Sequence, residues 1–507
     1  MDTGLDGIPA LREALELLRQ KMLQVVASHE EVIQRVDPAQ QLSCINLLQY
    51  LVLRSEDIRD LQHRLHILGL SSLSSSESHT YNQLSAVLER LSKPGEPGAP
   101  MGEAGGKSFF TYDQAVEDIG QKSKALFGIK VEATVPFIMV TLDTPFADDY
   151  QPVKELLSAG MNVARINCAH DDEAIWSKMI QNVLRAAEET GLSCKIYMDL
   201  AGPKIRTVLR GKKLEKHGIE VKEGDRIVLA EGVEDDSSGD DPIVGCTIEG
   251  IVRQLKKGER VLFDDGTIES EIAHIDGGRA TLTVTRVSRK KPFIKSEKGI
   301  NFPDSTLSLS SITDFDLACL PFVCAHADMI GYSFVRSVSG LAQLQDLVFS
   351  QRKKEQFIVL KIETQEAVKN LPALLIQGMR DRAFGVMIAR GDLGIEVGFE
   401  RMSEIQEEIL WICEAAHVPV IWATQVLEAL NKSGLATRSE ITDAAFSGRA
   451  ECVMINKGDH TIEVIETLKD ILFRGGGHHA KKRHTFRPLH IAEDYILLPQ
   501  SGIEIIE

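Results

Sequence analysis

The sequence predicts an α/β protein: a (β/α)8 TIM barrel with an inserted all-β lid domain, preceded by an N-terminal α-helical domain. Eight short apolar segments alternate with helical patterns, and most of them begin about 25–35 residues apart, the length of one βα unit. One interval, between the third and fourth segments, is much longer and reads as short β elements with turns. A stretch with only helical periodicity precedes both features.

Composition restricts the class of protein. A chain of 507 residues is too long for one ordinary domain. The net charge of −17 argues against nucleic acids and anionic membranes as partners. The 8 cysteines include no CxxC pair, which is typical of reduced thiols in the cytoplasm. Because neither a signal peptide nor an apolar run of membrane-spanning length is visible, we expect a cytoplasmic protein.

Residues 1–93 predict an N-terminal helical domain. Apolar residues recur at helical spacing within residues 11–26, 42–68 and 81–91. This segment contains no cluster of catalytic residue types, so we interpret it as a helical bundle that packs on itself or on a second copy. The Pro- and Gly-rich residues 94–107 predict a linker.

The catalytic barrel is predicted over residues 108–202 and 292–474, with a tail over residues 475–507. It begins with a short helix near residues 112–125. The predicted strands are short continuous apolar runs, as expected for strands that are buried on both faces: Phe137–Leu142, Asn162–Ile166, Lys195–Leu200, Met329–Val335, Phe357–Ile362, Gly385–Ala389, Val418–Ala423 and Cys452–Ile455.

An inserted β-barrel lid domain is predicted over residues 203–291. Short β patterns there alternate with glycine-containing turns. An insertion into the third βα loop lies over the carboxyl ends of the strands, where barrels carry their active sites. The inserted domain is therefore placed to close over a substrate.

Charged residues follow two neighbouring predicted strands. Lys361 and Glu363 end the fifth strand, and Asp392 follows the sixth. The two carboxylates could share one divalent cation, and their hard oxygens suit Mg²⁺ or Mn²⁺. Gly391 would let backbone N–H groups approach an anion at a helix start. An ion pair between Lys361 and Glu363 at the barrel rim is the alternative interpretation.

The side chains at the other strand ends are mostly polar or charged: Arg165, Asn167, His170, Asp199, Lys204, Arg206, Ser333, Arg336 and Thr424. Arg165 and Arg206, together with Lys361, would place three cations beside the carboxylates and under a lid. This is the composition of a phosphoryl-transfer site. Singly, each residue has an ordinary interpretation, such as a turn cap for Asn167 or a surface helix start for His170. The prediction therefore depends on their convergence.

At these positions the chain resembles the pyruvate kinase family. The matching motifs occur in the family's order and cover roughly residues 135–472: Asn162–His170, Asp199–Thr207, Ser333–Arg336, Lys361–Val368, Met387–Gly394, Ala423–Glu428 and Thr437–Asp443. The resemblance implies pyruvate kinase activity in glycolysis, the transfer of a phosphoryl group between phosphoenolpyruvate and ADP that yields pyruvate and ATP.

The resemblance also implies roles for individual residues. Glu363 and Asp392 would bind Mg²⁺ (or Mn²⁺), and Lys361 would stabilise the phosphoryl group in flight and the developing enolate. Arg165 would hold the transferred phosphate. The implied substrate contacts are the backbone N–H groups of Gly391 and Asp392, the side chain of Ser333, and Thr424 near the carbon that gains a proton. The implied nucleotide-side residues are Arg206, His170 and Arg165.

The chain departs from the family at its monovalent-cation site. The family uses Asn, Ser, Asp and Thr, and the corresponding residues here are Asn167, Ala169, Asp199 and Leu200. Lys204 stands where potassium-requiring members have Glu, so it resembles the potassium-independent branch. We therefore expect a vestigial site, with the Lys204 ammonium close to Asp199 as a charge substitute, and no requirement for K⁺.

Two further departures concern the end of the chain. The family's Ser-Gly-Glu-Thr-Ala loop is replaced by Asn456–His460, which alters the nucleotide side. The residues after 475 are too few for the family's C-terminal domain, so we expect that domain, with its effector site and one oligomer interface, to be absent. A homo-oligomer remains possible through other surfaces.

Two other functions are compatible with parts of the pattern. A Mg²⁺-dependent lyase or aldolase that works through a pyruvate enolate could use Glu363 and Asp392 equally well. Such an enzyme would need no nucleotide site. Arg206, His170 and the inserted lid therefore favour phosphoryl transfer over a lyase or aldolase. A non-catalytic regulatory paralogue would fit the altered loop but not the retained Lys361.

Overall fold

The computed structural model describes residues 7–92, 103–104, 107–130, 135–210, 216–231, 241–288, 292–352, 354–476, 479–480 and 483–484. The predicted linker (94–107) and tail (475–507) lie mostly outside these residues. Within them the structure describes only the strand pair β1 (Glu103–Ala104) and β2 (Lys107–Ser108), and the pair β20 (His479–Ala480) and β21 (Arg483–His484), together with the end of the last helix.

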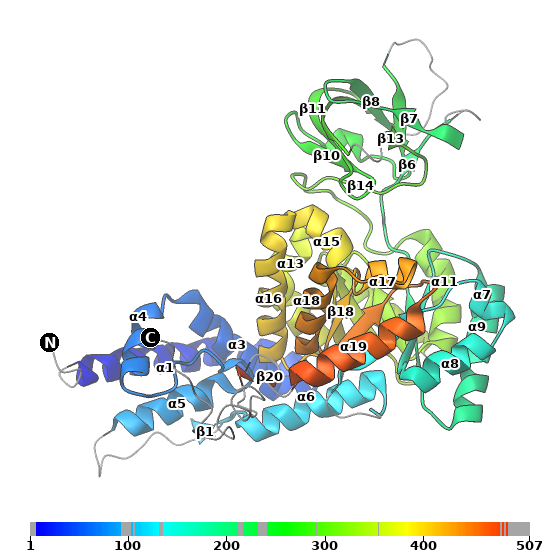
Figure 1. Cartoon of the computed structure of the whole chain (residues 1–507). Helices are drawn as coiled ribbons and strands as arrows, with labels where there is room; N and C mark the ends of the chain where they lie inside the picture. Colours follow the sequence, from blue (N-terminus) through cyan, green and yellow to red (C-terminus); the bar gives the residue numbers. More distant parts are fainter. Residues whose placement is uncertain are drawn as a thin grey trace, which may run out of the picture.

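A closed barrel of eight parallel strands forms the centre of the molecule (Figure 1). The order around the barrel is β15-β16-β17-β18-β19-β3-β4-β5. All eight strand predictions are confirmed, three of them with the predicted ends and five with an end that shifts by one to three residues: β3 (Phe137–Thr141), β4 (Val163–Asn167), β5 (Lys195–Asp199), β15 (Met329–Tyr332), β16 (Phe357–Ile362), β17 (Gly385–Ala389), β18 (Val420–Ala423) and β19 (Cys452–Ile455).

The strands are buried on both faces, which explains their continuous apolar sequences. Side chains such as Met139, Tyr197 and Met387 fill the interior of the barrel. A ring of helices covers the outside: α7 (Pro145–Asp148), α8 (Gln151–Ala159), α9 (Glu173–Thr190), α11 (Asp314–His326), α12 (Val338–Gln351), α13 (Gln365–Lys369), α14 (Leu371–Gly378), α15 (Arg390–Val397), α16 (Phe399–Ala415), α17 (Glu428–Ser433), α18 (Arg438–Phe446) and α19 (Thr461–Gly476).

The lid is a second β unit that stands above the barrel in Figure 1. A seven-stranded sheet with the order β14-β10-β11-β12-β8-β9-β6 and the pair β13-β7 build it around an apolar core of its own. β14 pairs with β10, so the sheet continues beyond the predicted edge at residue 291. The strands are β6 (Thr207–Val208), β7 (Ile219–Glu220), β8 (Arg226–Glu231), β9 (Ile243–Cys246), β10 (Arg260–Phe263), β11 (Ile268–Asp276), β12 (Arg279–Val287), β13 (Phe293–Ile294) and β14 (Ile300–Asn301).

The N-terminal region is helical, as predicted, although the second expected run is interrupted near residues 56–58. Its elements are α1 (Ile8–Ser28), α2 (Glu30–Arg35), η1 (Pro38–Gln40), α3 (Gln41–Ser55), α4 (Arg59–Ile67), η2 (Glu77–His79) and α5 (Thr80–Leu91). Helix α6 (Tyr112–Phe127) follows and places Leu126 and Phe127 against the lower interior of the barrel.

These N-terminal helices pack on the barrel at the end away from the lid (Figure 1). Asn46 Nδ2 donates to the carbonyls of Ala415, 2.8 Å away, and of Glu77, 2.7 Å away. Lys122 Nζ on α6 donates to Gln40 Oε1 at 2.8 Å. The expectation of a bundle that packs only on itself or on a second copy therefore missed its attachment to the barrel. Periodicity shows that a helix has an apolar face but does not show what covers that face.

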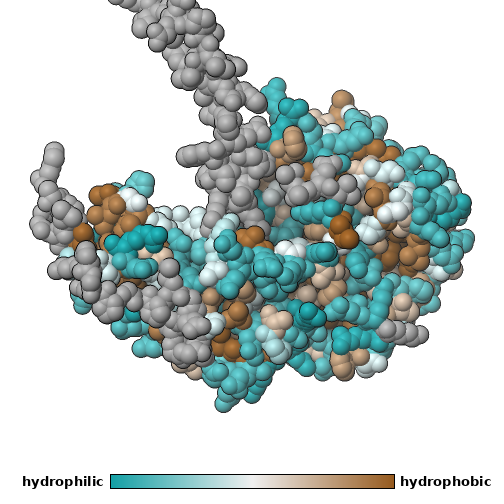
Figure 2. Space-filling view, turned by 90° about the horizontal axis from the view of Figure 1, so that it is seen from below, coloured by the Kyte–Doolittle hydropathy of each residue, from teal (hydrophilic) through white to brown (hydrophobic). Residues whose placement is uncertain are grey.

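The surface seen from below is mostly hydrophilic outside the area that the grey atoms cover, with apolar residues scattered across it (Figure 2). Among the described residues, no helix is both long enough and apolar enough to cross a membrane.

Candidate active site

Asp199 at the end of β5 is the buried centre of the site. Arg165 Nε from β4 donates to its Oδ2 at 2.7 Å, and the Tyr197 hydroxyl donates to its Oδ1 at 2.7 Å. Lys361 Nζ from β16 lies 3.6 Å from the same Oδ1. Burial alone would raise the pKa of Asp199, but Arg165 and then Lys361 outweigh it and lower that pKa below its ordinary value. Asp199 is therefore an anion that holds two cations at the barrel mouth.

A glycine in the neighbouring strand leaves room for these contacts with Asp199. β15 lies between β5 and β16, and Gly331 is paired with Asp199 in the strand register. A Cβ atom on Gly331 would lie 2.0 Å from Asp199 Oδ1 and 2.2 Å from the Tyr197 hydroxyl. Only a residue without a side chain leaves room for these groups. Gly331 was not among the predicted site residues, although a glycine in a buried barrel strand signals a close approach.

Lys361 is held as an ammonium among polar partners. Its Nζ donates to Ser333 Oγ at 2.7 Å and lies 3.2 Å from Glu363 Oε1. Burial would lower the pKa of Lys361, but the charges of Asp199 and Glu363 together raise it above its ordinary value. The ion pair between Lys361 and Glu363 that we considered as an alternative is thus present, but it is buried rather than at a solvated rim.

Glu363 is almost completely buried beyond the end of β16. Its Oε2 accepts a hydrogen bond of 2.6 Å from the backbone N–H of Phe334. Burial raises the pKa of Glu363, the Lys361 charge opposes this rise, and the nearby charge of Asp392 adds to it. Two close carboxylates, one of them desolvated, repel each other unless a cation joins them.

The residue pair Glu363 and Asp392 fits a hard divalent cation, which would offset that repulsion. Among the described residues, no group of three or more His, Cys, Asp or Glu side chains could hold a metal ion. Two protein carboxylates with water and substrate oxygens are, however, a common ligand set for Mg²⁺.

Lys204 differs from its expected position. Its Nζ donates to Asp392 Oδ1 at 2.7 Å, whereas the cations beside Asp199 are Arg165 and Lys361. The physical reason is that Asp199 is fully buried and already satisfied, while Asp392 is partly exposed at the edge of the mouth. The expectation that the Lys204 ammonium would lie close to Asp199 therefore disagrees with the geometry.

Thr424 and Gly391 meet at the ends of β18 and β17. The N–H of Gly391 donates to Thr424 Oγ1 at 2.8 Å. Thr424 has a φ of 65°, which is uncommon for a β-branched residue and marks stored backbone strain. Arg390 supports this turn, because its guanidinium donates to the carbonyls of Ala423 and Thr424. Arg390 was not among the predicted site residues, since its role depends on contacts between separate segments.

The chain shares this barrel with a known family. A family model described as pyruvate kinase, barrel domain, matches residues 136–463. The chain belongs to the pyruvate kinase family.

Curated relatives agree with this assignment. The pyruvate kinase of Bacillus licheniformis is 31% identical over 338 residues, which cover 65% of this chain and 55% of the relative. That of Thermotoga maritima is 32% identical over 338 residues, with 64% of this chain and 68% of the relative covered. That of Clostridium perfringens is 30% identical over 335 residues, covering 64% and 67%. The chain spans about half the length of the first of these relatives.

Arg206 and His170 are two of the residues that we expected to lie near the nucleotide. Arg206 lies at the base of the lid, where its Nη1 donates to the Glu297 carbonyl at 3.1 Å. Partial burial lowers the pKa of His170, and the charges of Lys457 and Arg206 lower it further. Lys457 belongs to the altered loop Asn456–His460, so this loop contributes a positive charge that acts on His170.

Asn167 has the ordinary role that we considered for it. Its Oδ1 accepts a hydrogen bond of 3.1 Å from the N–H of Ala169, which makes it a turn cap. At the positions of the family's monovalent-cation site, cationic side chains therefore contact Asp199, and the backbone N–H of Ala169 binds Asn167.

Proposed function

We propose that this chain is a pyruvate kinase, which transfers a phosphoryl group between phosphoenolpyruvate and ADP with Mg²⁺ or Mn²⁺ bound by Glu363 and Asp392. The observation that carries the proposal is the buried cation pair Lys361 and Arg165, held in place by Asp199. Charge develops on the transferred phosphoryl oxygens and on the enolate, and prearranged cations stabilise both without reorganisation.

Each side chain acts on a defined part of the reaction. In the glycolytic direction, an oxygen of the ADP β-phosphate attacks phosphorus, and the bond between phosphorus and the enol oxygen breaks. Lys361 faces the phosphoryl group and the enolate oxygen, and Arg165 holds the phosphoryl oxygens. The enolate carbon then takes a proton near Thr424 to form pyruvate. The N–H group of Asp392 at the start of α15 would receive the substrate carboxylate, joined by that of Gly391 once the substrate displaces Thr424 Oγ1 from it.

The bound cation would neutralise charge on the substrate phosphate and carboxylate. The lid, placed over the carboxyl ends of the strands, would exclude water that could otherwise capture the phosphoryl group.

The cations near His170 favour this reaction over a lyase or aldolase. Arg206 and Lys457 both act electrostatically on His170. A pyruvate-enolate lyase has no use for a second phosphate-binding region, whereas a kinase needs one for ADP. Because the charge of Lys457, in the altered loop Asn456–His460, acts on His170, the change in this loop is a weaker argument for a non-catalytic paralogue.

A coupled assay with phosphoenolpyruvate, ADP and lactate dehydrogenase tests the proposal. The wild-type chain should produce pyruvate, and Lys361→Met and Asp392→Ala should each lose at least about a hundredfold in kcat. Lys432→Met is the matched control, because Lys432 is an exposed lysine on α17 that pairs with Glu428 of the same helix. Folded wild-type protein without turnover would favour the regulatory paralogue, and a normal rate for Asp392→Ala would reject the proposed metal site.

A further inference from the structure

Tyr197 is a neutral donor among the charged side chains at the barrel mouth. It belongs to the interior of the barrel and precedes Asp199 by two residues on β5, so both side chains lie on the same face of the strand. Its hydroxyl donates to Asp199 Oδ1 at 2.7 Å. Burial and then the charge of Asp199 raise the pKa of Tyr197 well above its ordinary value. The hydroxyl therefore keeps its proton and remains a donor.

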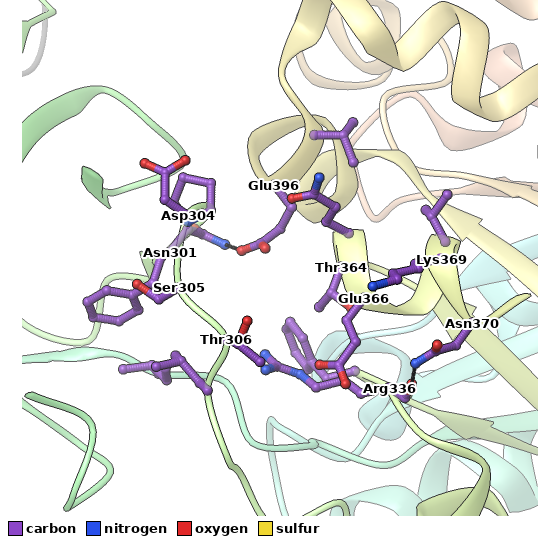
Figure 3. A pocket seen from close by; sticks show the side chains of 18 of the residues that line it. Asn301, Asp304, Ser305, Thr306, Arg336, Thr364, Glu366, Lys369, Asn370 and Glu396 are labelled. Atoms are coloured by element: carbon purple, nitrogen blue, oxygen red, sulfur yellow. Dashed lines mark hydrogen bonds between the residues drawn. The ribbon is translucent and has the colours of Figure 1, made fainter. Parts of the chain in front are cut away.

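Solvent does not compete for this hydroxyl. Tyr197 is fully buried. It also lies outside the lining of the cavity of about 560 Å³ between the lid base and the barrel, whose walls carry charges of both signs, among them Glu366, Glu396, Arg336 and Lys369 (Figure 3). A hydrogen bond that is shielded from water is electrostatically stronger than one at the surface. The contact between Tyr197 and Asp199 is therefore a fixed part of the mouth.

Gly331 provides the space for the tyrosine ring. On β15, which neighbours β5, Met329 is paired with Tyr197 and Gly331 with Asp199. A Cβ atom on Gly331 would lie 2.2 Å from the Tyr197 hydroxyl oxygen and 2.7 Å from Cζ of the ring. The phenol group thus fills the space that a side chain at position 331 would take. The tyrosine and the glycine are a matched pair that brings a hydroxyl to Asp199.

The Asp199 carboxylate is held at both of its oxygens. Its Oδ2 accepts from Arg165 Nε at 2.7 Å and lies 2.5 Å from Arg165 Nη2, while its Oδ1 accepts from Tyr197. The carboxylate cannot rotate without losing one of these bonds. Lys361 Nζ lies 3.6 Å from Oδ1, which is too long for a hydrogen bond. Asp199 therefore attracts the Lys361 ammonium without bonding to it.

This distance affects how the N–H groups of Lys361 are used. An ammonium has three N–H donors. One is donated to Ser333 Oγ at 2.7 Å, and Glu363 Oε1, 3.2 Å away, is within reach of a second. Asp199 does not take the third, which leaves it for an oxygen of the substrate.

We propose that Tyr197 is a positioning residue, whose hydroxyl fixes Asp199 and so keeps one N–H of Lys361 available for the transferred phosphoryl group and the enolate oxygen. This inference rests on the phosphoryl transfer proposed above. Without the hydroxyl, Asp199 Oδ1 would lose its neutral donor and draw the Lys361 ammonium into a hydrogen bond. The charge that develops on the substrate oxygens would then be stabilised less.

Kinetics of Tyr197→Phe, which removes only the hydroxyl, test the role in turnover. We expect kcat to fall at least about tenfold, while KM for ADP changes less than about twofold. Tyr150→Phe is the matched control, because the Tyr150 hydroxyl donates to Glu189 Oε2 at 3.2 Å on the surface, away from the mouth. An unchanged kcat in folded Tyr197→Phe would overturn this inference alone. A wild-type chain without turnover would instead count against the kinase reaction.

A binding measurement distinguishes positioning from a general loosening of the mouth, and it needs no turnover. Oxalate carries a negative oxygen where pyruvate carries a neutral carbonyl oxygen, so oxalate imitates the enolate. Isothermal titration calorimetry with Mg²⁺ should show oxalate binding at least about tenfold more weakly to Tyr197→Phe than to the wild type, and pyruvate binding less than about threefold more weakly. Equal losses for both ligands would overturn the proposed role.

A second variant retains the hydrogen bond and guards against misfolding of Tyr197→Phe. Replacement of Tyr197 by p-aminophenylalanine keeps the ring and a neutral donor, but an amine N–H is a weaker donor to a carboxylate than a phenol O–H. Oxalate should therefore bind this variant about two- to fivefold more weakly than the wild type, between the other two proteins. An affinity equal to that of the wild type, or a loss as large as that of Tyr197→Phe, would overturn the proposal.

Discussion

Lys204 Nζ lies 2.7 Å from Asp392 Oδ1, which joins the first residues of the lid connection to a carboxylate of the candidate metal site. Lys204 follows Gly202, whose φ of 68° marks the turn where the chain leaves the barrel. A divalent cation bound by Asp392, as proposed above, would have to compete with this ammonium. The proposed metal site would then be linked to the position of the lid through the side chain of Lys204.

The first prediction is that Lys204→Met binds Mn²⁺ more tightly than the wild type. The ion pair is partly exposed, so its loss should favour the metal by about 0.5–1 kcal/mol, or a factor of about two to five. Electron paramagnetic resonance of free Mn²⁺ measures this affinity directly. Lys154→Met on α8 serves as the control, because Lys154 pairs with Glu189 on α9, away from the mouth. Unchanged or weaker Mn²⁺ binding in Lys204→Met would contradict the competition.

The second prediction is that turnover does not require K⁺. Ala169 offers no side-chain oxygen at the family's monovalent-cation site, and Arg165 and Lys361 already neutralise Asp199. We expect kcat/KM in tetramethylammonium buffer at constant ionic strength to change less than about tenfold on adding K⁺. A larger rise, equivalent to more than about 1.4 kcal/mol of transition-state stabilisation, would show that a functional cation site persists.

The third prediction concerns Gly331. A methyl group there would overlap the Asp199 carboxylate, so Gly331→Ala should destabilise the barrel by about 1–3 kcal/mol and reduce turnover. Urea denaturation followed by circular dichroism measures the first effect. Gly120→Ala on α6 is the control: a Cβ atom there meets no neighbour, so helix propensity should leave stability equal or raise it by up to about 1 kcal/mol. A fully stable and active Gly331→Ala would refute the proposed close approach.

The fourth prediction concerns the attachment of the N-terminal helices to the barrel. Asn46→Ala removes two donated hydrogen bonds and one accepted from the N–H of Thr80, and it leaves buried partners unsatisfied. We expect a loss of about 1–3 kcal/mol and faster amide hydrogen exchange in η2 and at the end of α16. Gln24→Ala, on the exposed face of α1, should stay within about 0.5 kcal/mol of wild type. Exchange that speeds up equally in both variants would argue against a specific docking contact.

Several features of this molecule follow from local sequence patterns. The eight strands were predictable because each is a short apolar run between helical patterns, and strands buried on both faces tolerate few other residues. The gathering of Lys361, Glu363 and Asp392 also followed, because the carboxyl ends of neighbouring parallel strands must meet at one mouth. The lid was predictable from one interval that was too long for a βα unit.

Contacts between distant segments were decided only by the folded chain. Lys204 pairs with Asp392 because closure of the barrel leaves Asp199 buried, hydrogen-bonded to Arg165 and Tyr197 and ion-paired with Lys361, a competition that no local pattern encodes. The surface that the N-terminal helices cover depends in the same way on contacts between distant segments, such as the hydrogen bond from Asn46 to the carbonyl of Ala415 at the end of α16. Periodicity specifies which face of an element is apolar. The partner of a buried charge is specified by the three-dimensional arrangement, because electrostatic and hydrogen-bond energies depend on distance and burial rather than on separation along the chain.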